Sequence, residues 1–476
     1  MSTELTVYTG QLVYKDITFT FIFDKSELRL IPPKERIDEI NLEWIMTPIE
    51  KGVYTFNDQL KMTEPFLVGK CNENGHKFIF VTQPESRIGN RNSVLFVQIV
   101  AFIECLSDKE LIGKISFSNS EIDHIYPTNQ ALQYSFDIAK SQCNGIFSVT
   151  TKDNESTTTE KQCFFVDEKE VQVSFGIKRT LHSGIEKAPM TLTSMIQFEF
   201  NPTNDYSFIL RLWRIAREFI RFLCYRRNIN MPSADLISVD PNKDNKHERF
   251  GTIYIINENY EPEPETLKSV RYIKYEYISG HEGEILNDIA DNSLYTRHFP
   301  ETYESGRHID ASRFIMITAA FEWEFHREYP SGVPRSEKSA QIENIATNAI
   351  QSLIDSSSGK LRDKYQFLKK LIKSDSLEKE IIKMGKDYDE VIGFFGKYLY
   401  KLNGETLVYS EMGKRLSNQR NHFAHGDLDK DFIGLSLLDL AYMEYAVYAL
   451  QLKHYGIDSN NIQKSINCLF HLNFAL

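Results

Sequence analysis

The chain has 476 residues, of which 41% are hydrophobic and 25% are charged, and these values are typical of a globular protein. It is too long for one ordinary hydrophobic core, so we expect two or three domains. The formal net charge of -11 argues against a general nucleic-acid coat protein, because such proteins are basic overall. A local basic groove remains compatible with this charge.

The cysteines and the first residues indicate the compartment. Six cysteines are scattered along the chain with no C-x-x-C pair and no short metal-binding spacing, which indicates reduced thiols in the cytoplasm. The start, MSTELTVYTG, lacks the positive and apolar regions of a secretion signal, and the longest apolar runs are shorter than a membrane span. We therefore expect a soluble, cytoplasmic protein that does not bind membranes.

Residues 1–202 are expected to form a β-rich domain. Short runs of β-branched and aromatic residues recur there, and polar, Gly and Asn breaks separate them. The runs are LTVYTGQLVY, ITFTFIF, HKFIFVTQ, SVLFVQIVAF, CFFVDEKEVQVSFGI and MTLTSMIQFEF. Their spacing predicts an antiparallel sandwich or a barrel-like domain.

The hydrophobic period changes near residue 202. In NPTNDYSFILRLWRIAREFIRFLCYRRN, apolar residues recur at three- and four-residue steps, which predicts an amphipathic helix with Asn204 or Asp205 as its N-cap. Two strand candidates, GTIYIIN and SVRYIKYEYI, follow in a charged region. We therefore interpret residues 203–305 as a connecting helix and mixed segment, and we expect the parts on either side to have separate cores.

Helical periodicity dominates residues 306–476. Successive amphipathic runs are joined by short polar connections, as in helical bundles. The runs include DASRFIMITAAFEWEFHREY, SEKSAQIENIATNAIQSLID, RDKYQFLKKLIK, LEKEIIKMGKDYDEVIGFFGKYLYKL and GLSLLDLAYMEYAVYALQLKHYG. The predicted fold class is therefore α+β, with a β-rich N-terminal domain followed by an all-α bundle.

One polar stretch near the end of the chain, QRNHFAHGD, combines an arginine with two histidines. Gly426 suits the C′ position that ends a helix. Arg420 and His425 are five residues apart, which separates them by about 140° on a regular helix. One site can use both if the helix ends between them, if Arg420 reaches around the helix, or if two copies of the helix meet in a dimer.

These residue types suit metal-independent RNA cleavage. That reaction needs a base for the 2′-OH proton, an acid for the leaving 5′-oxygen and a cation near the phosphorane charge. Histidine titrates near neutral pH, arginine binds phosphate oxygens through two donors, and Asn421 can orient the histidine or hold an oxygen. No nearby Asp, Glu or His cluster has metal-ligand spacing, so we expect neither a two-metal site nor a cofactor.

RNHFAH, Arg420–His425, has the R-x4-6-H form of HEPN domains, in the variant where Asn follows Arg. A β-rich domain before such a bundle resembles the ApeA family of anti-phage abortive-infection proteins. The resemblance implies a metal-independent endoribonuclease whose composite site forms in a homodimer or higher homo-oligomer. It assigns Arg420, Asn421 and His425 as catalytic residues and implies products with a 2′,3′-cyclic phosphate and a 5′-OH.

The resemblance also implies a supporting acidic residue, an RNA substrate and a trigger. Many such enzymes use an acidic or polar residue from an earlier helix, and Glu322 and Glu324 in AAFEWEF are both candidates between which the sequence does not choose. The substrate would be an RNA, with tRNA among the candidates. A phage-derived trigger, unidentified, would act through the β-rich domain as a sensor or regulator.

Other interpretations remain open at the level of sequence. Cations near a helix C-terminus are ordinary because they stabilise the helix dipole, and a HEPN-type bundle that has lost activity could bind RNA or nucleotide, or only dimerise. Separately, four arginines of the helix after residue 202 lie on one face that could hold RNA phosphates or could pair with acids such as Glu218. They are Arg211, Arg214, Arg217 and Arg221.

Overall fold

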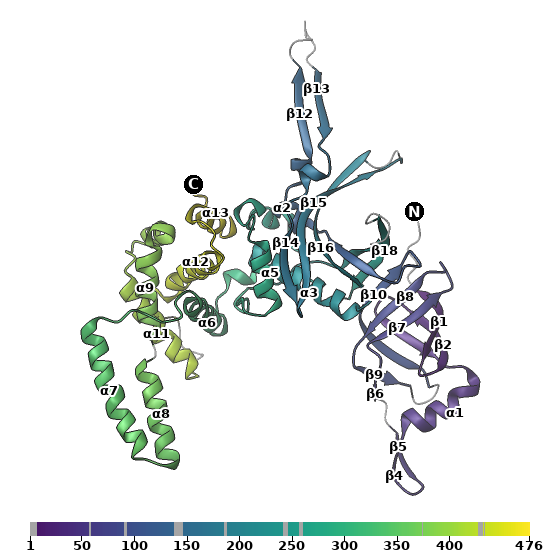
Figure 1. Ribbon diagram of the computed structural model, residues 1–476, viewed down its shortest axis with the longest axis horizontal. Helices are drawn as coiled ribbons and strands as arrows, with labels where there is room; N and C mark the ends of the chain where they lie inside the picture. Colours follow the sequence, from purple (N-terminus) through teal and green to yellow (C-terminus); the bar gives the residue numbers. More distant parts are fainter. Residues whose placement is uncertain are drawn as a thin grey trace. The chain divides into compact units, whose positions relative to one another are not determined.

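The computed structural model describes residues 7–56, 59–89, 93–137, 146–184, 188–240, 246–256, 260–373, 375–426, 432 and 434–476. The chain divides into two compact units. Unit 1 comprises Met1–Arg221, Asn228–Ser269 and Glu282–Asp291, and unit 2 comprises Phe222–Arg227, Val270–His281 and Asn292–Leu476. Unit 1 is β-rich and unit 2 is helical (Figure 1), which confirms the predicted α+β class.

Six antiparallel strands of unit 1 close into a barrel. They are β1 (Tyr8–Tyr14), β2 (Ile17–Phe23), β3 (Glu27–Ile31), β7 (Phe66–Cys71), β8 (Lys77–Thr82) and β10 (Leu95–Cys105). Their order is β10–β3–β2–β1–β7–β8, and β8 pairs again with β10. Phe19, Phe21 and Phe23 alternate along β2 and are fully buried, because every second side chain of a strand faces the barrel core.

The sheet continues beyond the barrel through a second group of strands. They are β11 (Ile112–Phe117), β14 (Gln162–Val166), β15 (Lys169–Leu181), β16 (Met190–Thr203), β17 (Ser233–Asp240) and β18 (Lys246–Ile255). The order from the barrel is β10–β18–β17–β11–β16–β15–β14. β17 and β18 therefore lie between β10 and β11, where they satisfy the backbone groups of two strands that would otherwise be sheet edges.

Smaller elements of unit 1 complete it. The short strands are β4 (Met46–Glu50), β5 (Val53–Phe56), β6 (Gln59–Lys61), β9 (Glu85–Ile88), β12 (Leu132–Asp137) and β13 (Ile146–Thr151). The helices are α1 (Ile37–Ile40), α2 (Ser120–Ile125), α4 (Glu265–Lys268) and α5 (Glu282–Ala290), the last of which packs on β14 and β15.

The structure divides residues 203–305 between the two units, so they do not form the separate connecting segment expected from sequence. α3 (Tyr206–Cys224) starts as predicted, and the Asp205 carboxylate accepts a hydrogen bond from the Phe208 amide at 3.1 Å. The Gly251–Ile255 part of GTIYIIN lies in β18, and its Asn257 lies outside the described residues. The strand prediction for SVRYIKYEYI is wrong, because this stretch holds only a 3₁₀ turn, Tyr275–Tyr277. Its Ile273 and Ile278 are fully buried, so their apolar character serves packing, which strand propensity alone does not distinguish.

This topology predicts the behaviour of a truncated chain. A fragment of residues 203–476 keeps β17 and β18 but loses β10 and β11, so it exposes two unpaired strand edges. We expect it to aggregate when expressed, and we expect the full chain to stay monodisperse under the same conditions. A monodisperse 203–476 fragment in size-exclusion chromatography would show that β17 and β18 stay folded without pairing to β10 and β11.

Unit 2 is built from helices. They are α6 (Ala311–Glu328), α7 (Glu337–Asp355), α8 (Gly359–Lys373), α9 (Leu377–Tyr388), α10 (Phe394–Leu402), α11 (Tyr409–Ala424), α12 (Ser436–His454) and α13 (Ser459–Leu469). α12 is the central helix, buried almost all round, and it contacts α6, α10, α11 and α13. Among the helices of the described residues, none combines the length and apolar character that crossing a membrane requires.

Candidate functional site

The arginine–histidine motif lies at the C-terminal end of α11. The helix ends at Ala424, His425 is the C-cap, and Gly426 follows with φ of +92°, the left-handed conformation that glycine adopts without strain. Gly426 is therefore the C′ residue, as predicted. Because α11 ends between Arg420 and His425, one of the three conditions for a shared site is met within a single chain.

Packing of α11 fixes the direction of Arg420. Leu416, Gln419 and Phe423 are buried, and the Phe423 ring lies edge-on to Phe314 of α6 with a centroid distance of 5.4 Å. α11 also packs along α9. The intervening Arg420 reaches α6, where its Nη1 donates to Oε1 of Glu322 at 2.8 Å.

Four ionisable side chains gather where α6, α9 and α11 meet, and we call Glu322, His326, Glu380 and Arg420 the Arg420 cluster. Glu322 and His326 are four residues apart on α6 and share a face. His326 Nε2 lies 3.4 Å from Oε1 of Glu380, which is buried on α9. The other carboxylate oxygen of Glu380, Oε2, is buried and has no hydrogen-bond partner among the described residues.

The surroundings of Glu380 favour its neutral form. Burial raises its pKa, the nearby Glu322 and Asp375 raise it further, and Arg420 partly offsets them, which gives a value of about 7. Burial likewise raises the pKa of Glu322, while Arg420 and His326 oppose the rise. The cluster therefore combines a fixed cation with a carboxyl group that exchanges its proton near neutral pH, as acid–base catalysis requires.

The raised pKa of Glu380 makes unit 2 less stable at high pH. The unfolded carboxyl has an ordinary pKa of 4.5, so the folded state holds the proton more tightly. Its stabilising contribution is complete below pH 4.5 and is lost as pH rises through about 7. We expect Glu380→Gln to raise the free energy of unfolding at pH 8 by on the order of 2 kcal/mol.

Urea unfolding of Glu380→Gln at pH 8 and at pH 4 measures this effect, with the exposed Glu405→Gln as the matched control. The gain should shrink towards zero at pH 4 and should be absent in the control at both pH values. A gain that is independent of pH would contradict the assigned environment of Glu380.

The structure separates the two acidic candidates of α6. Glu322 binds Arg420, whereas Glu324 faces the interior and is 1% exposed. Glu324 accepts hydrogen bonds from the Tyr295 amide and the Gln451 side chain, each at 3.1 Å, and from Arg327 at 2.8 Å. Glu324 therefore joins segments of unit 2, and Glu322 is the acidic residue beside the motif.

The remaining motif side chains face solvent. Asn421 and His425 are exposed, and His422, which was given no catalytic role, is half-buried. The His425 backbone amide donates to the carbonyl oxygens of Asn421 and His422 at 3.1 and 3.2 Å. Within the described part of the chain, the His425 ring makes no hydrogen bond or ion pair, so it is free to contact a ligand.

The four arginines of α3 have different surroundings. Arg211 pairs with Asp167, and Arg221 pairs with Glu218 at 2.6 Å. The Arg217 guanidinium lies over the Trp213 ring, 4.5 Å from its centroid, and burial beside Arg221 and Arg214 lowers its pKa to about 10. Arg214 is exposed. Two of the four charges are thus balanced within unit 1, although binding of RNA by this face stays a prediction.

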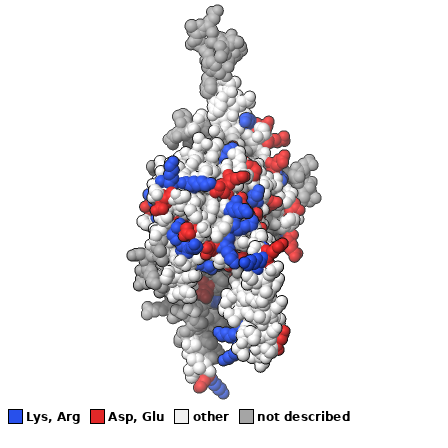
Figure 2. Space-filling view, turned by 90° about the vertical axis from the view of Figure 1, so that its left-hand side faces the viewer, with Lys and Arg blue, Asp and Glu red and all other residues white. Residues whose placement is uncertain are grey.

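Figure 2 shows one face of the molecule, on which Lys and Arg side chains are interspersed with Asp and Glu. The described part of that face carries no continuous basic surface of the kind that tracks a nucleic-acid backbone. Among the described residues, no group of three or more His, Cys, Asp or Glu side chains could hold a metal ion.

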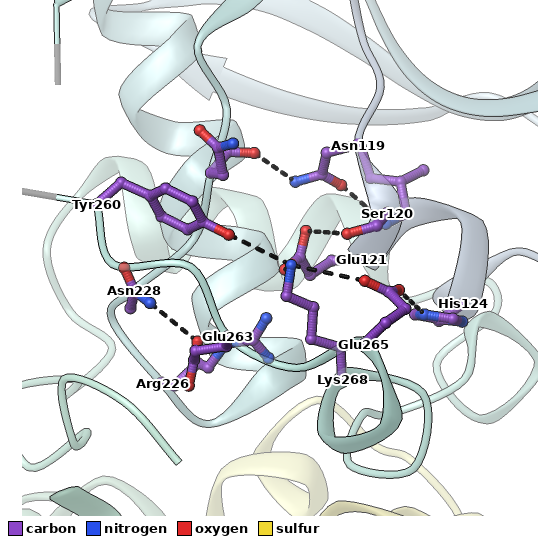
Figure 3. Close-up of polar contacts among 12 residues, drawn as sticks. Asn119, Ser120, Glu121, His124, Arg226, Asn228, Tyr260, Glu263, Glu265 and Lys268 are labelled. Atoms are coloured by element: carbon purple, nitrogen blue, oxygen red, sulfur yellow. Dashed lines mark hydrogen bonds and ion pairs between the residues drawn. The ribbon is translucent and has the colours of Figure 1, made fainter. Parts of the chain in front are cut away.

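A second buried polar cluster lies in unit 1 (Figure 3). Lys268 Nζ is 3.7 Å from carboxylate oxygens of both Glu121 and Glu265, and it donates to the Tyr260 hydroxyl at 3.3 Å. His124 Nε2 lies 2.7 Å from Glu265. Burial lowers the pKa of Lys268, but Glu121, Tyr260 and Glu265 outweigh it and raise the pKa above its ordinary value. These residues join α2, α4 and the chain before α4.

This cluster predicts a large stability loss when its cation is removed. Lys268→Met removes the cation beside Glu121, which is 2% exposed, and should lower the free energy of unfolding by about 3 kcal/mol. Lys169→Met, at an exposed pair with Asp205, should cost about 0.5 kcal/mol or less. Urea unfolding compares the two variants, and the double change Lys268→Met with Glu121→Gln should recover most of the loss. Equal losses at both lysines would show that the buried cluster is not structural.

Comparison of the chain with known proteins finds no matching family model, no matching curated protein and no matching solved structure.

Proposed function

We propose that unit 2 is a metal-independent endoribonuclease whose site comprises Arg420, Asn421 and His425. The observation that supports it most is the Arg420 cluster, which places a fixed cation at the end of α11 beside Glu380, a carboxyl group with a pKa of about 7. This deepens the sequence prediction, because the motif arginine has acidic neighbours from two other helices. Arginine held by carboxylates keeps a defined orientation for phosphate.

In the proposed reaction, the substrate 2′-oxygen attacks the adjacent phosphorus. A bond forms between O2′ and phosphorus, and the bond from phosphorus to O5′ breaks. One acid–base group takes the O2′ proton and another gives a proton to O5′, leaving a 2′,3′-cyclic phosphate and a 5′-OH. Arg420 stabilises the charge on the phosphorane, and the exposed His425 ring carries one of the two protons.

Glu322 acts on the cation in this scheme. Its ion pair at 2.8 Å holds Arg420 in place, and the same carboxylate competes with phosphate for the guanidinium. Arg420 is 38% exposed and Glu322 is 23% exposed, so a phosphate can approach the pair from solvent. Glu322 is therefore a positioning residue. Glu380 is 1% exposed and does not reach the substrate, so the second proton carrier is a histidine of a second copy of the motif.

A binding module that holds RNA or nucleotide without cleaving it is the second candidate. One observation favours it: in the described residues nothing orients the His425 ring, whereas catalytic histidines are usually fixed by a hydrogen-bond partner. In that case Arg420 would still bind phosphate. His425→Ala would then leave both RNA affinity and the cellular effect unchanged.

We further propose that the protein is an effector of abortive infection in which unit 1 senses a phage-derived trigger. The order of the two units supports this role, because a cytoplasmic ribonuclease must be inactive until it is needed. Unit 1 has a cleft of about 680 Å³ that could receive a ligand, and Lys70, His76 and Lys77 are among its lining residues.

Expression of wild type and His425→Ala under phage challenge, with total RNA resolved on a gel, tests the proposed role in abortive infection. Intact RNA and no protection with wild type would contradict it.

A further inference from the structure

The helical hairpin of α7 and α8 carries apolar side chains that unit 2 leaves in solvent. Figure 1 shows the two helices side by side, and among the described elements their extensive contacts are with each other. In α7 only Ile354 is buried. Between 43% and 70% of the surface is exposed for each of six large side chains, Ile342, Ile345, Leu353, Leu361, Phe367 and Leu368.

The hairpin is nevertheless a defined structure. Arg335 binds Glu343 at 2.6 Å and Asp375 at 2.9 Å, which ties the start of α7 to the chain just beyond the end of α8. Lys369 donates to Gln351 at 2.5 Å across the two helices. An ordered pair of helices with this much exposed apolar surface is expected to have a partner, since monomers rarely leave large apolar patches in water.

The apolar residues form stripes. Ile342, Ile345 and Leu353 fall within an arc of about 80° on α7. On α8, Leu361, Phe367 and Leu368 fall within an arc of about 120°. Stripes of this spacing are typical of helices that pack in antiparallel bundles. The two helices of one hairpin do not bury these stripes by packing against each other, so a further pair of helices is needed to cover them.

Charge indicates what covers the stripes. α7 has three acidic residues and one basic residue, a net charge of -2, and α8 has six basic residues and one acidic residue, a net charge of +5. When two identical hairpins meet about a two-fold axis, α7 of each copy can lie on α8 of the other, and opposite charges then face each other twice. Packing α8 on α8 would instead oppose two basic helices.

We propose that the α7–α8 hairpin is a dimerisation element that forms a four-helix bundle with the same hairpin of a second copy of this chain. This interface does not depend on the proposed ribonuclease activity. RNA is a weaker fit for the surface, because phosphates would neutralise α8 but leave the apolar side chains of α7 in water. An unrelated acidic protein would satisfy α8 and leave α7 without a complementary charge.

The oligomeric state of the full chain tests the proposal by sedimentation equilibrium. Wild type should be a dimer, and Ile345→Glu combined with Phe367→Glu should raise the dimer dissociation constant by at least about 100-fold. Both side chains are mostly exposed, so circular dichroism should show unchanged helix content. If the double variant loses helix, Phe367→Ser alone should still weaken the dimer. Leu402→Glu, at a 66% exposed leucine of α10, is the matched control and should remain dimeric.

A second variant changes only the charge of α8 and keeps its apolar side chains. Lys364→Glu with Lys370→Glu should also weaken the dimer, because both changes remove positive charge from α8. A monomeric wild type, or a dimer that is unaffected by the Ile345 and Phe367 changes, would overturn the proposal. It would also fail if the lysine variant loses RNA binding while the oligomeric state stays unchanged, because α8 would then be an RNA-binding surface.

Discussion

Purified His425→Ala should retain the fold and lose RNA cleavage. His425 is an exposed C-cap residue, so its imidazole contributes little packing and its removal leaves no buried charge behind. Loss of one general acid or base costs about a hundred- to ten-thousand-fold in rate, and residual cleavage should be close to background. The measurement is the initial rate on a labelled RNA under conditions in which the wild type gives a linear time course.

The matched control is His308→Ala, another exposed histidine of unit 2, which should cleave at the wild-type rate. Circular dichroism and thermal unfolding should be the same for both variants and wild type. Undiminished cleavage by His425→Ala would remove the histidine from the proposed mechanism and favour the binding module.

Arg420→Ala should reduce cleavage by about a hundred- to a thousand-fold, because it removes the cation that stabilises charge on the phosphorane. It should also weaken RNA binding and make that binding less sensitive to salt, since one phosphate contact is lost. Loss of the guanidinium also removes the interaction that opposes the rise in the pKa of Glu380, so that pKa should move further above its ordinary value. The measurements are the cleavage rate, RNA affinity over a salt series and the pH–rate profile.

Arg420→Lys distinguishes charge from shape. Lysine keeps the charge but not the two-donor geometry, so we expect its rate to lie between those of Arg420→Ala and wild type. Arg307→Ala, at an exposed pair with Glu304, is the matched control and should be unchanged. If Arg420→Ala binds and cleaves RNA as wild type does, the pair of Arg420 with Glu322 has only a structural role.

Local patterns in the sequence predicted the elements well. The alternation in ITFTFIF predicted β2, the three- and four-residue steps after residue 202 predicted α3, and Gly426 marked the end of α11. Pairings between distant segments were not predictable in this way. The insertion of β17 and β18 between β10 and β11 depends on backbone hydrogen bonds among strands more than a hundred residues apart, which leave no periodic trace in one sequence.

The residues of the candidate site also fall into those that local sequence patterns predicted and those that only the tertiary fold brings together. One sequence motif indicated Arg420, Asn421 and His425, but no pattern distinguished Glu322 from Glu324. The four-residue step from Glu322 to His326 on α6 was a signal that could have found His326. Glu380 had no such signal, because its nearness to Arg420 arises only when α9 packs beside α11.

The chemical ends of the RNA products test the central claim most directly. Purified full-length chain is incubated with a defined RNA in EDTA, and the products are identified by mass spectrometry, with His425→Ala in parallel. Wild type should give 2′,3′-cyclic phosphate and 5′-OH ends, and His425→Ala should give neither above background. Products with a plain 3′-OH that appear only when divalent metal is supplied would contradict the assignment.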